Sequence, residues 1–97
     1  MSKLRKSAKG RECQIRIPGV CSHDNSTVVL CHLGGAGMGT KNDDMFGAFG
    51  CSACHDVVDR RKYTHIALPW DMVRIWFYDG IIRTQKIWLE EGLISHD

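Results

Sequence analysis

The chain has 97 residues, a formal net charge of +2 and a hydrophobic share of 43%. This length predicts one domain over residues 1–97 and excludes two independent cores. So short a chain buries only a modest part of its apolar surface, and a metal ion or a covalent cross-link would stabilise it. The small net charge gives, by itself, no indication of a nucleic-acid partner.

The first eleven residues form a basic N-terminal arm, residues 1–11, with these cationic side chains: Lys3, Arg5, Lys6, Lys9 and Arg11. No apolar segment of the signal-peptide kind follows them, and no stretch reaches the roughly 18 to 20 apolar residues of a membrane span. We therefore expect a cytoplasmic protein. The clustered charges can neutralise phosphates, but a solubilising tail explains the arm equally well.

Three short strands are predicted in the first half of the chain. Polar and apolar residues alternate over 14–17 before a Pro-Gly turn, which predicts a half-buried strand. The β-branched run 27–30 predicts a second strand that leads directly to His32. Residues 34–40 are rich in glycine and predict a flexible connector, since no Walker-type Gly-Lys-Ser/Thr follows. Residues 45–50 predict a short strand returning toward Cys51.

Two helices are predicted after these strands. The first covers about 53–62, with Ser52 as its N-cap. The second covers 69–91, with Pro69 in its first turn and Gly92 as its C-cap. Its apolar residues recur at steps of three and four and predict a buried stripe: Val73, Trp76, Phe77, Gly80, Thr84, Ile87 and Trp88. Gly80 marks a kink or a close packing contact. Short strands followed by helices predict an α+β fold.

The five cysteines are many for a chain of this length. Cytosolic thiols stay reduced, which favours a metal ion over disulfides. Seven residues separate Cys13 from Cys21, and Cys51 and Cys54 form a Cys-x-x-Cys pair at a predicted helix start. Two such pairs can make a closed tetrahedral site with four sulfur ligands. We predict a structural Zn²⁺ at these four residues, which leaves Cys31 outside the site.

The segment Cys51–His55 has two competing interpretations. Cys-x-x-Cys-His is also the attachment motif of c-type haem. That chemistry needs export to an oxidising compartment, for which the sequence shows no signal. A thioredoxin-like redox pair would need a βαβ frame that the pattern lacks. Zinc binding fits the sequence better than either of these.

The order of these motifs resembles the HNH nucleases, whose ββα-metal fold is often braced by a four-cysteine zinc site. The likeness rests on the cysteine pairs, the strand that ends in His32, the glycine-rich loop and the pattern Cys-x-x-Cys-His-x-x-x-Asp over 51–59. More narrowly, residues 11–21, 37–41 and 51–56 are similar to the prophage-encoded YbcO-like nuclease family and to the nuclease domain of the phage recombination-enhancement protein Ref. The resemblance covers most of residues 4–92 and implies a small, treble-clef-like HNH fold with a long C-terminal helix.

The resemblance implies a metal-dependent endonuclease that hydrolyses phosphodiester bonds in DNA. His32 matches the general base that takes a proton from the attacking water. His55 matches a ligand of the catalytic divalent ion. Asp59 stands where such enzymes often have a histidine, and a carboxylate there favours Mg²⁺ or Mn²⁺.

Two positions depart from the HNH pattern. The residue before the base is commonly an acidic or histidine metal ligand, whereas this chain has Cys31. The middle asparagine falls among three residues, Asn42, Asp43 and Asp44. Asp44 matches the Ref-like pattern best, and it could join His55 and Asp59 in a second metal site. Because of these departures, few residues match the catalytic metal ligands of the HNH pattern.

Basic residues beside the motifs indicate the partner. Arg60, Arg61 and Lys62 follow the Cys-x-x-Cys-His segment, and Lys41 follows the glycine-rich loop. We expect these four residues to contact DNA phosphates, and a recombination protein is a compatible second partner. The rival hypothesis is a non-catalytic zinc module that binds DNA or a protein, which needs the four cysteines but not His32.

Overall fold

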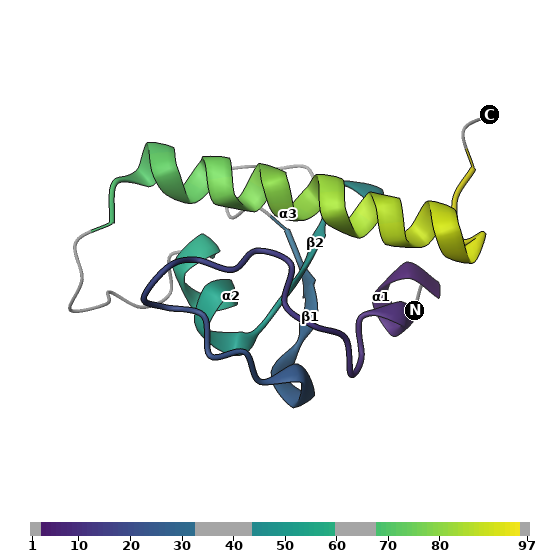
Figure 1. Cartoon of the computed structure of the whole chain (residues 1–97), viewed down its shortest axis with the longest axis horizontal. Coiled ribbons are helices and arrows are strands. Elements are labelled where there is room, and N and C mark those ends of the chain that lie inside the picture. Colours follow the sequence, from purple (N-terminus) through teal and green to yellow (C-terminus); the bar gives the residue numbers. More distant parts are fainter. Residues whose placement is uncertain (1–2, 33–43, 60–67, 96–97) are drawn as a thin grey trace.

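The computed structural model describes residues 3–32, 44–59 and 68–95. Its elements follow one another in this order: α1 (Lys3–Ser7), a 3-10 turn η1 (Asn25–Thr27), β1 (Val29–Cys31), a 3-10 turn η2 (Asp44–Phe46), β2 (Ala48–Gly50), α2 (Ser52–Val58) and α3 (Trp70–Glu91). The long helix α3 lies along one side of the molecule, with the two strands, α2 and the N-terminal segment beneath it (Figure 1). The predicted α+β class and the long C-terminal helix are confirmed.

The sheet is a short antiparallel pair. Its register places Val29 opposite Gly50, Leu30 opposite Phe49 and Cys31 opposite Ala48. Both strands begin later than the ranges predicted at 27–30 and 45–50, because a 3-10 turn takes up the first residues of each range, and β1 extends one residue beyond its range to Cys31. Helix α2 follows the second strand directly, so the central part of the chain has the order β-β-α.

The strand predicted over residues 14–17 is wrong. Ile15 and Ile17 are buried and Arg16 is exposed, as the alternating pattern required, but Gln14 is buried as well. Arg16, however, has a φ of 56°, in the left-handed region that no extended strand visits. The segment is therefore a loop, held to the sheet by one hydrogen bond from the Gln14 amide to the Phe49 carbonyl at 2.7 Å.

Helix α3 packs through the predicted stripe. Its fully buried residues are Val73, Phe77, Gly80, Thr84 and Trp88. Gly92 ends the helix in the left-handed conformation, with a φ of 76°, as a C-cap should. A Cβ atom on Gly80 would lie 3.1 Å from the Gln14 carbonyl oxygen and 3.2 Å from the Ile15 Cα. Gly80 is therefore the close packing contact between α3 and the loop.

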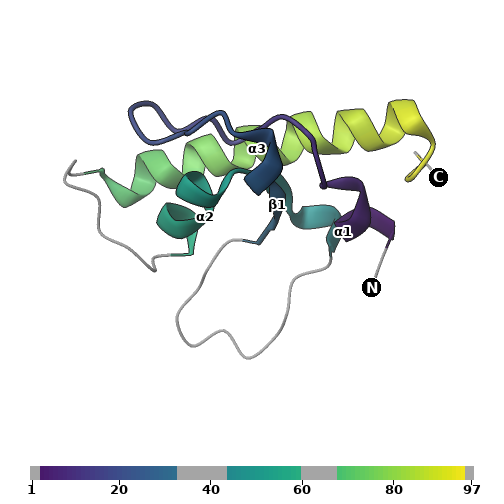
Figure 2. The same cartoon turned by 90° about the horizontal axis from the view of Figure 1, so that it is seen from below.

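The N-terminal arm is joined to the C-terminal half of α3. The Trp88 indole donates a hydrogen bond to the Ser7 hydroxyl at 2.8 Å. Arg11 donates two hydrogen bonds to the Glu91 carboxylate, at 2.6 and 2.7 Å. Both views show α1 beside this end of α3 (Figures 1 and 2). The arm is thus part of the fold from Lys3 onward, and not a detached tail.

Replacing Gly80 by alanine should destabilise the protein. Alanine raises helix propensity by about 1 kcal/mol, but the new methyl group would press on backbone atoms that cannot move without shifting the loop. Overpacking of this kind costs about 1 to 3 kcal/mol, so we expect a net loss of roughly 1 kcal/mol in the free energy of unfolding, measured by urea denaturation. Asp79→Ala, at the exposed neighbouring position, is the control. A Gly80→Ala protein more stable than the parent would contradict this packing.

Candidate functional site

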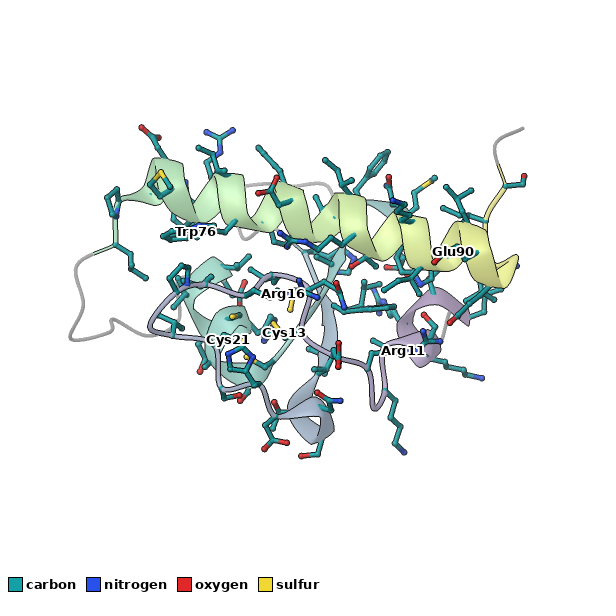
Figure 3. All side chains as sticks on the ribbon, in the orientation of Figure 1. Arg11, Cys13, Arg16, Cys21, Trp76 and Glu90 are labelled. Carbon is teal, nitrogen blue, oxygen red and sulfur yellow. The ribbon has the colours of Figure 1, made fainter. Side chains whose placement is uncertain are left out.

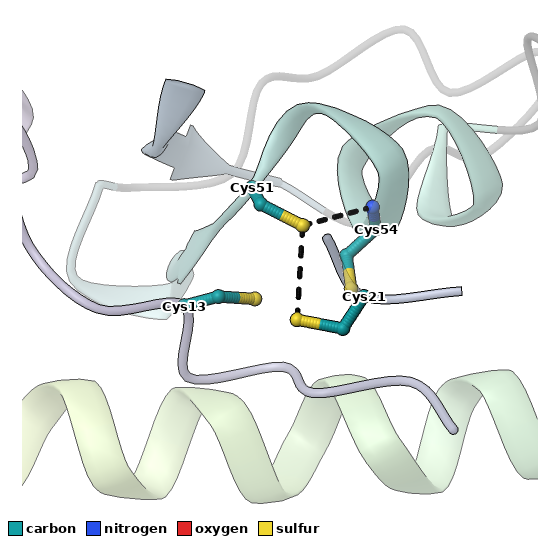
Figure 4. Close-up of side chains that lie close together, drawn as sticks. All are labelled: Cys13, Cys21, Cys51 and Cys54. Carbon is teal, nitrogen blue, oxygen red and sulfur yellow. Dashed lines mark hydrogen bonds between the residues drawn. The ribbon is translucent and has the colours of Figure 1, made fainter. Parts of the chain in front are cut away.

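The four cysteines predicted as ligands lie together between the N-terminal loop and the start of α2. The Sγ atoms of Cys13, Cys21, Cys51 and Cys54 are all within 4.8 Å of one another. Cys13, Cys51 and Cys54 are buried and Cys21 is half-buried. Their side chains converge from three directions (Figure 4), and Cys13 and Cys21 lie on the loop beneath α3 (Figure 3). A cluster of this kind could hold a metal ion such as zinc.

Local backbone geometry presents these sulfur atoms. Arg16 and His23 both have a φ of 56°. The Arg16 amide adds to the lowering of the Cys13 pKa that a hydrogen bond from Cys54 causes. The His23 amide, in contrast, only partly offsets the burial that raises the pKa of Cys21. Each of the two loop cysteines is thus followed by a residue with positive φ whose N–H group is directed toward the cysteine sulfur. Such donors stabilise a thiolate.

Cys51 belongs to the cysteine cluster and also caps helix α2. Its sulfur accepts hydrogen bonds from the amides of Cys54 at 3.5 Å and Ser22 at 3.4 Å. Cys51 is therefore the N-cap of α2, and the prediction that Ser52 fills this role is wrong. The sulfur replaces the usual cap oxygen because the chain turns from β2 into α2 at this residue.

The spacing of the sulfur atoms suits a tetrahedral ion. Four sulfur atoms at about 2.3 Å from a central zinc ion would lie about 3.8 Å from one another. The Sγ atoms of Cys21 and Cys51 are 3.8 Å apart, far beyond the length of about 2.0 Å of a disulfide bond. All five cysteines are free thiols.

The thiols differ in their affinity for protons. A hydrogen bond from Cys54 lowers the pKa of Cys13 to about 4, and the same bond raises the pKa of Cys54. Burial raises the pKa of Cys21 to about 11. Burial also opposes ionisation of Cys51, but hydrogen bonds from Ser22 and Cys54 outweigh it and lower the pKa of this thiol. The protons on the thiols with raised pKa values thus limit the negative charge of the cluster. A bound cation would displace these protons.

Cys31 lies outside the cluster, as predicted. It is fully buried in β1, with its sulfur 3.8 Å from the Gly50 carbonyl oxygen on β2. Burial raises the pKa of its thiol. A Cβ atom on Gly50 would lie 2.7 Å from the Cys31 sulfur, so Cys31 fills the space that the glycine leaves.

The structure brings His32 and Asp44 together. His32 follows the last residue of β1 and Asp44 begins η2. The His32 Nε2 atom lies 3.0 Å from Asp44 Oδ1, and the same oxygen accepts a hydrogen bond from Arg5 Nε at 3.1 Å. Sequence reasoning named His32 and Asp44 but missed Arg5, whose only signal was its place in the basic arm.

His55 lies on α2, and Asp59 is the C-cap residue one turn later. Both are half-buried, and the Asp59 amide donates to the His55 carbonyl as α2 ends. Within residues 3–32, 44–59 and 68–95, the four cysteines make up the single group of three or more Cys, His, Asp or Glu ligand atoms close enough to share a metal ion. Asp44, His55 and Asp59 are not brought into a second such group there.

The remaining predicted site residues lie outside the described ranges. These are Lys41, Asn42, Asp43, Arg60, Arg61 and Lys62. Their roles stay predictions from the sequence. Among the helices of the described part, none is long and apolar enough to cross a membrane.

Comparison with known proteins shows similarity over nearly the whole chain. The family model described as "Putative nuclease YbcO" matches residues 2–93. Two relatives are each 48% identical over 98% of this chain and 99% of their own length: "Putative nuclease YbcO" of Escherichia coli (strain K12) and "Putative nuclease ybcO" of Enterobacteria phage 82. A solved structure, "Structure of a putative bacteriophage protein from Escherichia coli str. K-12 substr. MG1655", is 46% identical, covers 93% of this chain and 100% of that chain, and superposes with a TM-score of 0.78.

Replacing a cysteine of the cluster should remove the metal ion, whereas replacing Cys31 should not. We expect Cys54→Ser to lose most of the bound metal, because a hydroxyl is a poor substitute for a thiolate ligand. Cys31→Ser is the matched control, equally buried and of the same size, and it should retain about one ion per chain. The metal content of both variants is measured by elemental mass spectrometry. Loss of metal from both variants, or from neither, would contradict the assignment.

Metal affinity should rise steeply with pH. Cys21 and Cys54 have raised pKa values and hold their protons at neutral pH, so an ion must displace at least two protons. The dissociation constant should therefore fall by at least about a hundredfold per pH unit between about pH 6 and 8, measured by competition with a chelator. A change of less than about tenfold per unit would show that the thiols are already ionised.

Proposed function

The chain belongs to the family described as "Putative nuclease YbcO", and we propose that it is an HNH-type endonuclease that hydrolyses DNA phosphodiester bonds with a divalent metal ion. The β-β-α order of the central elements and the four-cysteine cluster support this type of nuclease. A relative in Enterobacteria phage 82 links the family to bacteriophages.

The geometry of His32 is the observation that carries the proposal. An ionised carboxylate can only accept hydrogen bonds, and Asp44 accepts one from Arg5 and one from His32. The Nε2 atom of a neutral His32 therefore carries the proton, and its Nδ1 atom is a base. A histidine held in this tautomer can take a proton from a water molecule at neutral pH.

The phosphodiester would be bound on the side of the molecule where α2 meets β1. These two elements are in contact, and α2 carries His55 and Asp59, the proposed ligands of Mg²⁺ or Mn²⁺. A divalent ion bound there would polarise the phosphate and stabilise the leaving oxygen. Lys41, Arg60, Arg61 and Lys62 are the proposed contacts to the flanking phosphates.

The four-cysteine cluster has a structural role in this proposal. Four sulfur ligands complete a tetrahedral zinc site and leave no position for a water molecule or a substrate. Zinc there would connect the loop that carries Cys13 and Cys21 to the start of α2. It would thereby fix the helix that carries His55.

The second candidate is a zinc module that binds DNA or a protein without cleaving it. One observation favours it: in the described part of the chain, no second group of metal-ligating side chains gathers near His32. In this case the cysteines keep their structural role, and the hydrogen bond between His32 and Asp44 only stabilises the end of β1.

Substitution of His32 separates the two candidates. We expect the wild-type protein to nick supercoiled plasmid DNA with Mg²⁺ or Mn²⁺, and we expect His32→Ala to lower the single-turnover rate by about 10² to 10⁴-fold, the usual contribution of a general base. DNA affinity, measured by filter binding, should change little. His96→Ala is the control, because the sequence assigns His96 to no site.

Equal cleavage by the wild type and His32→Ala would refute His32 as the base. If the wild type binds DNA but leaves single-stranded, linear and supercoiled forms intact with either metal ion, the binding module is the correct function.

A further inference from the structure

Arg5 donates to the carboxylate oxygen that holds His32, and we infer that Arg5 is a positioning residue for His32. Arg5 Nε lies 3.1 Å and His32 Nε2 lies 3.0 Å from the Oδ1 atom of Asp44. The consequence for catalysis rests on the proposed function, whereas the effect on the His32 side chain does not. This assigns the basic arm a role inside the site, in addition to any contact with phosphates.

The position of Arg5 is fixed by the packing of α1. This helix contacts β1, which directly precedes His32, and η2, which begins at Asp44. Ala8, just after the helix, is buried. The Ser7 hydroxyl donates to the Leu4 carbonyl at 2.6 Å and accepts a hydrogen bond from Trp88. The backbone that carries Arg5 is therefore held against α3 on one side and against the His32 segment on the other.

A second donor on Asp44 fixes the orientation of its carboxylate group, which a single donor would leave free to rotate. A carboxylate with one partner can rotate and present either oxygen, and the imidazole ring can follow it. With Arg5 also bound, the Oδ1 atom of Asp44 stays directed at His32 Nε2. The three side chains are 47% (Arg5), 18% (Asp44) and 27% (His32) exposed. Partly exposed ion pairs contribute little to stability, so orientation is the main effect that we assign to Arg5.

The tautomer of His32 gives a test that does not depend on cleavage. In the ¹⁵N-labelled full-length protein, long-range ¹H–¹⁵N spectra distinguish the Nε2–H from the Nδ1–H form. We expect Nε2–H in the wild type and a mixture of both forms in Arg5→Ala. Arg5→Lys retains a charged donor and should restore much of the Nε2–H form. Lys6→Ala removes a neighbouring charge of α1 and should match the wild type. An unchanged His32 spectrum in Arg5→Ala overturns the inference.

Kinetics test the consequence of this tautomer shift. In a wild type that cleaves DNA, Arg5→Ala should lower kcat by about tenfold, which is typical for the loss of a partner behind a catalytic group, with KM nearly unchanged. A rise in KM at constant kcat would overturn the inference, because it would make Arg5 a simple phosphate contact. If the wild type does not cleave DNA, the proposed function fails, and the tautomer spectra still decide the role of Arg5.

Discussion

The convergence of four cysteine sulfur atoms is the constraint on which the rest of the structure depends. Four thiolates within 4.8 Å of one another would repel strongly in a mostly buried site. Protons relieve this in part, since the pKa of Cys54 is raised while that of Cys13 is lowered. A divalent cation would offset half of the charge of four thiolates and would supply a cross-link that stabilises a chain of this size. The loop that carries Cys13 is not a strand of the sheet, and an ion at the cluster would connect this loop to α2.

The same cross-link would set the position of the elements around His32. Cys51 directly follows β2 and caps α2, so an ion at the cluster would fix the corner between them. β2 pairs with β1, and β1 leads to His32. Helix α3 contacts β2 through the Thr84 hydroxyl, which accepts a hydrogen bond from the Phe49 amide at 3.1 Å. It contacts the loop through Arg83, which donates to the Gln14 carbonyl at 2.6 Å. With an ion bound, the cysteine cluster and α3 would together hold the sheet in place.

Much of this arrangement could be predicted from the sequence, because it depends on local pattern. The stripe of α3 follows from helical periodicity, and the cysteine cluster from spacing and residue type. The strand over 14–17 failed because alternating burial does not reveal a left-handed φ at Arg16. Ser52 was the conventional cap, but the turn at Cys51 placed a sulfur there instead. The bond between Arg5 and Asp44 joins residues 39 positions apart, and no local signal could indicate it.

The cluster alone does not decide between a nuclease and a binding module, because both functions need the same cross-link. The Arg5–Asp44–His32 arrangement does bear on this choice. Asp44 is a partly exposed carboxylate with two cationic or polar donors on one oxygen, and pairs of this kind contribute little to folding. A role in stability is therefore a weak explanation for it. A histidine held in one tautomer is what proton transfer requires, and a binding surface has no such need, so this local geometry favours the nuclease.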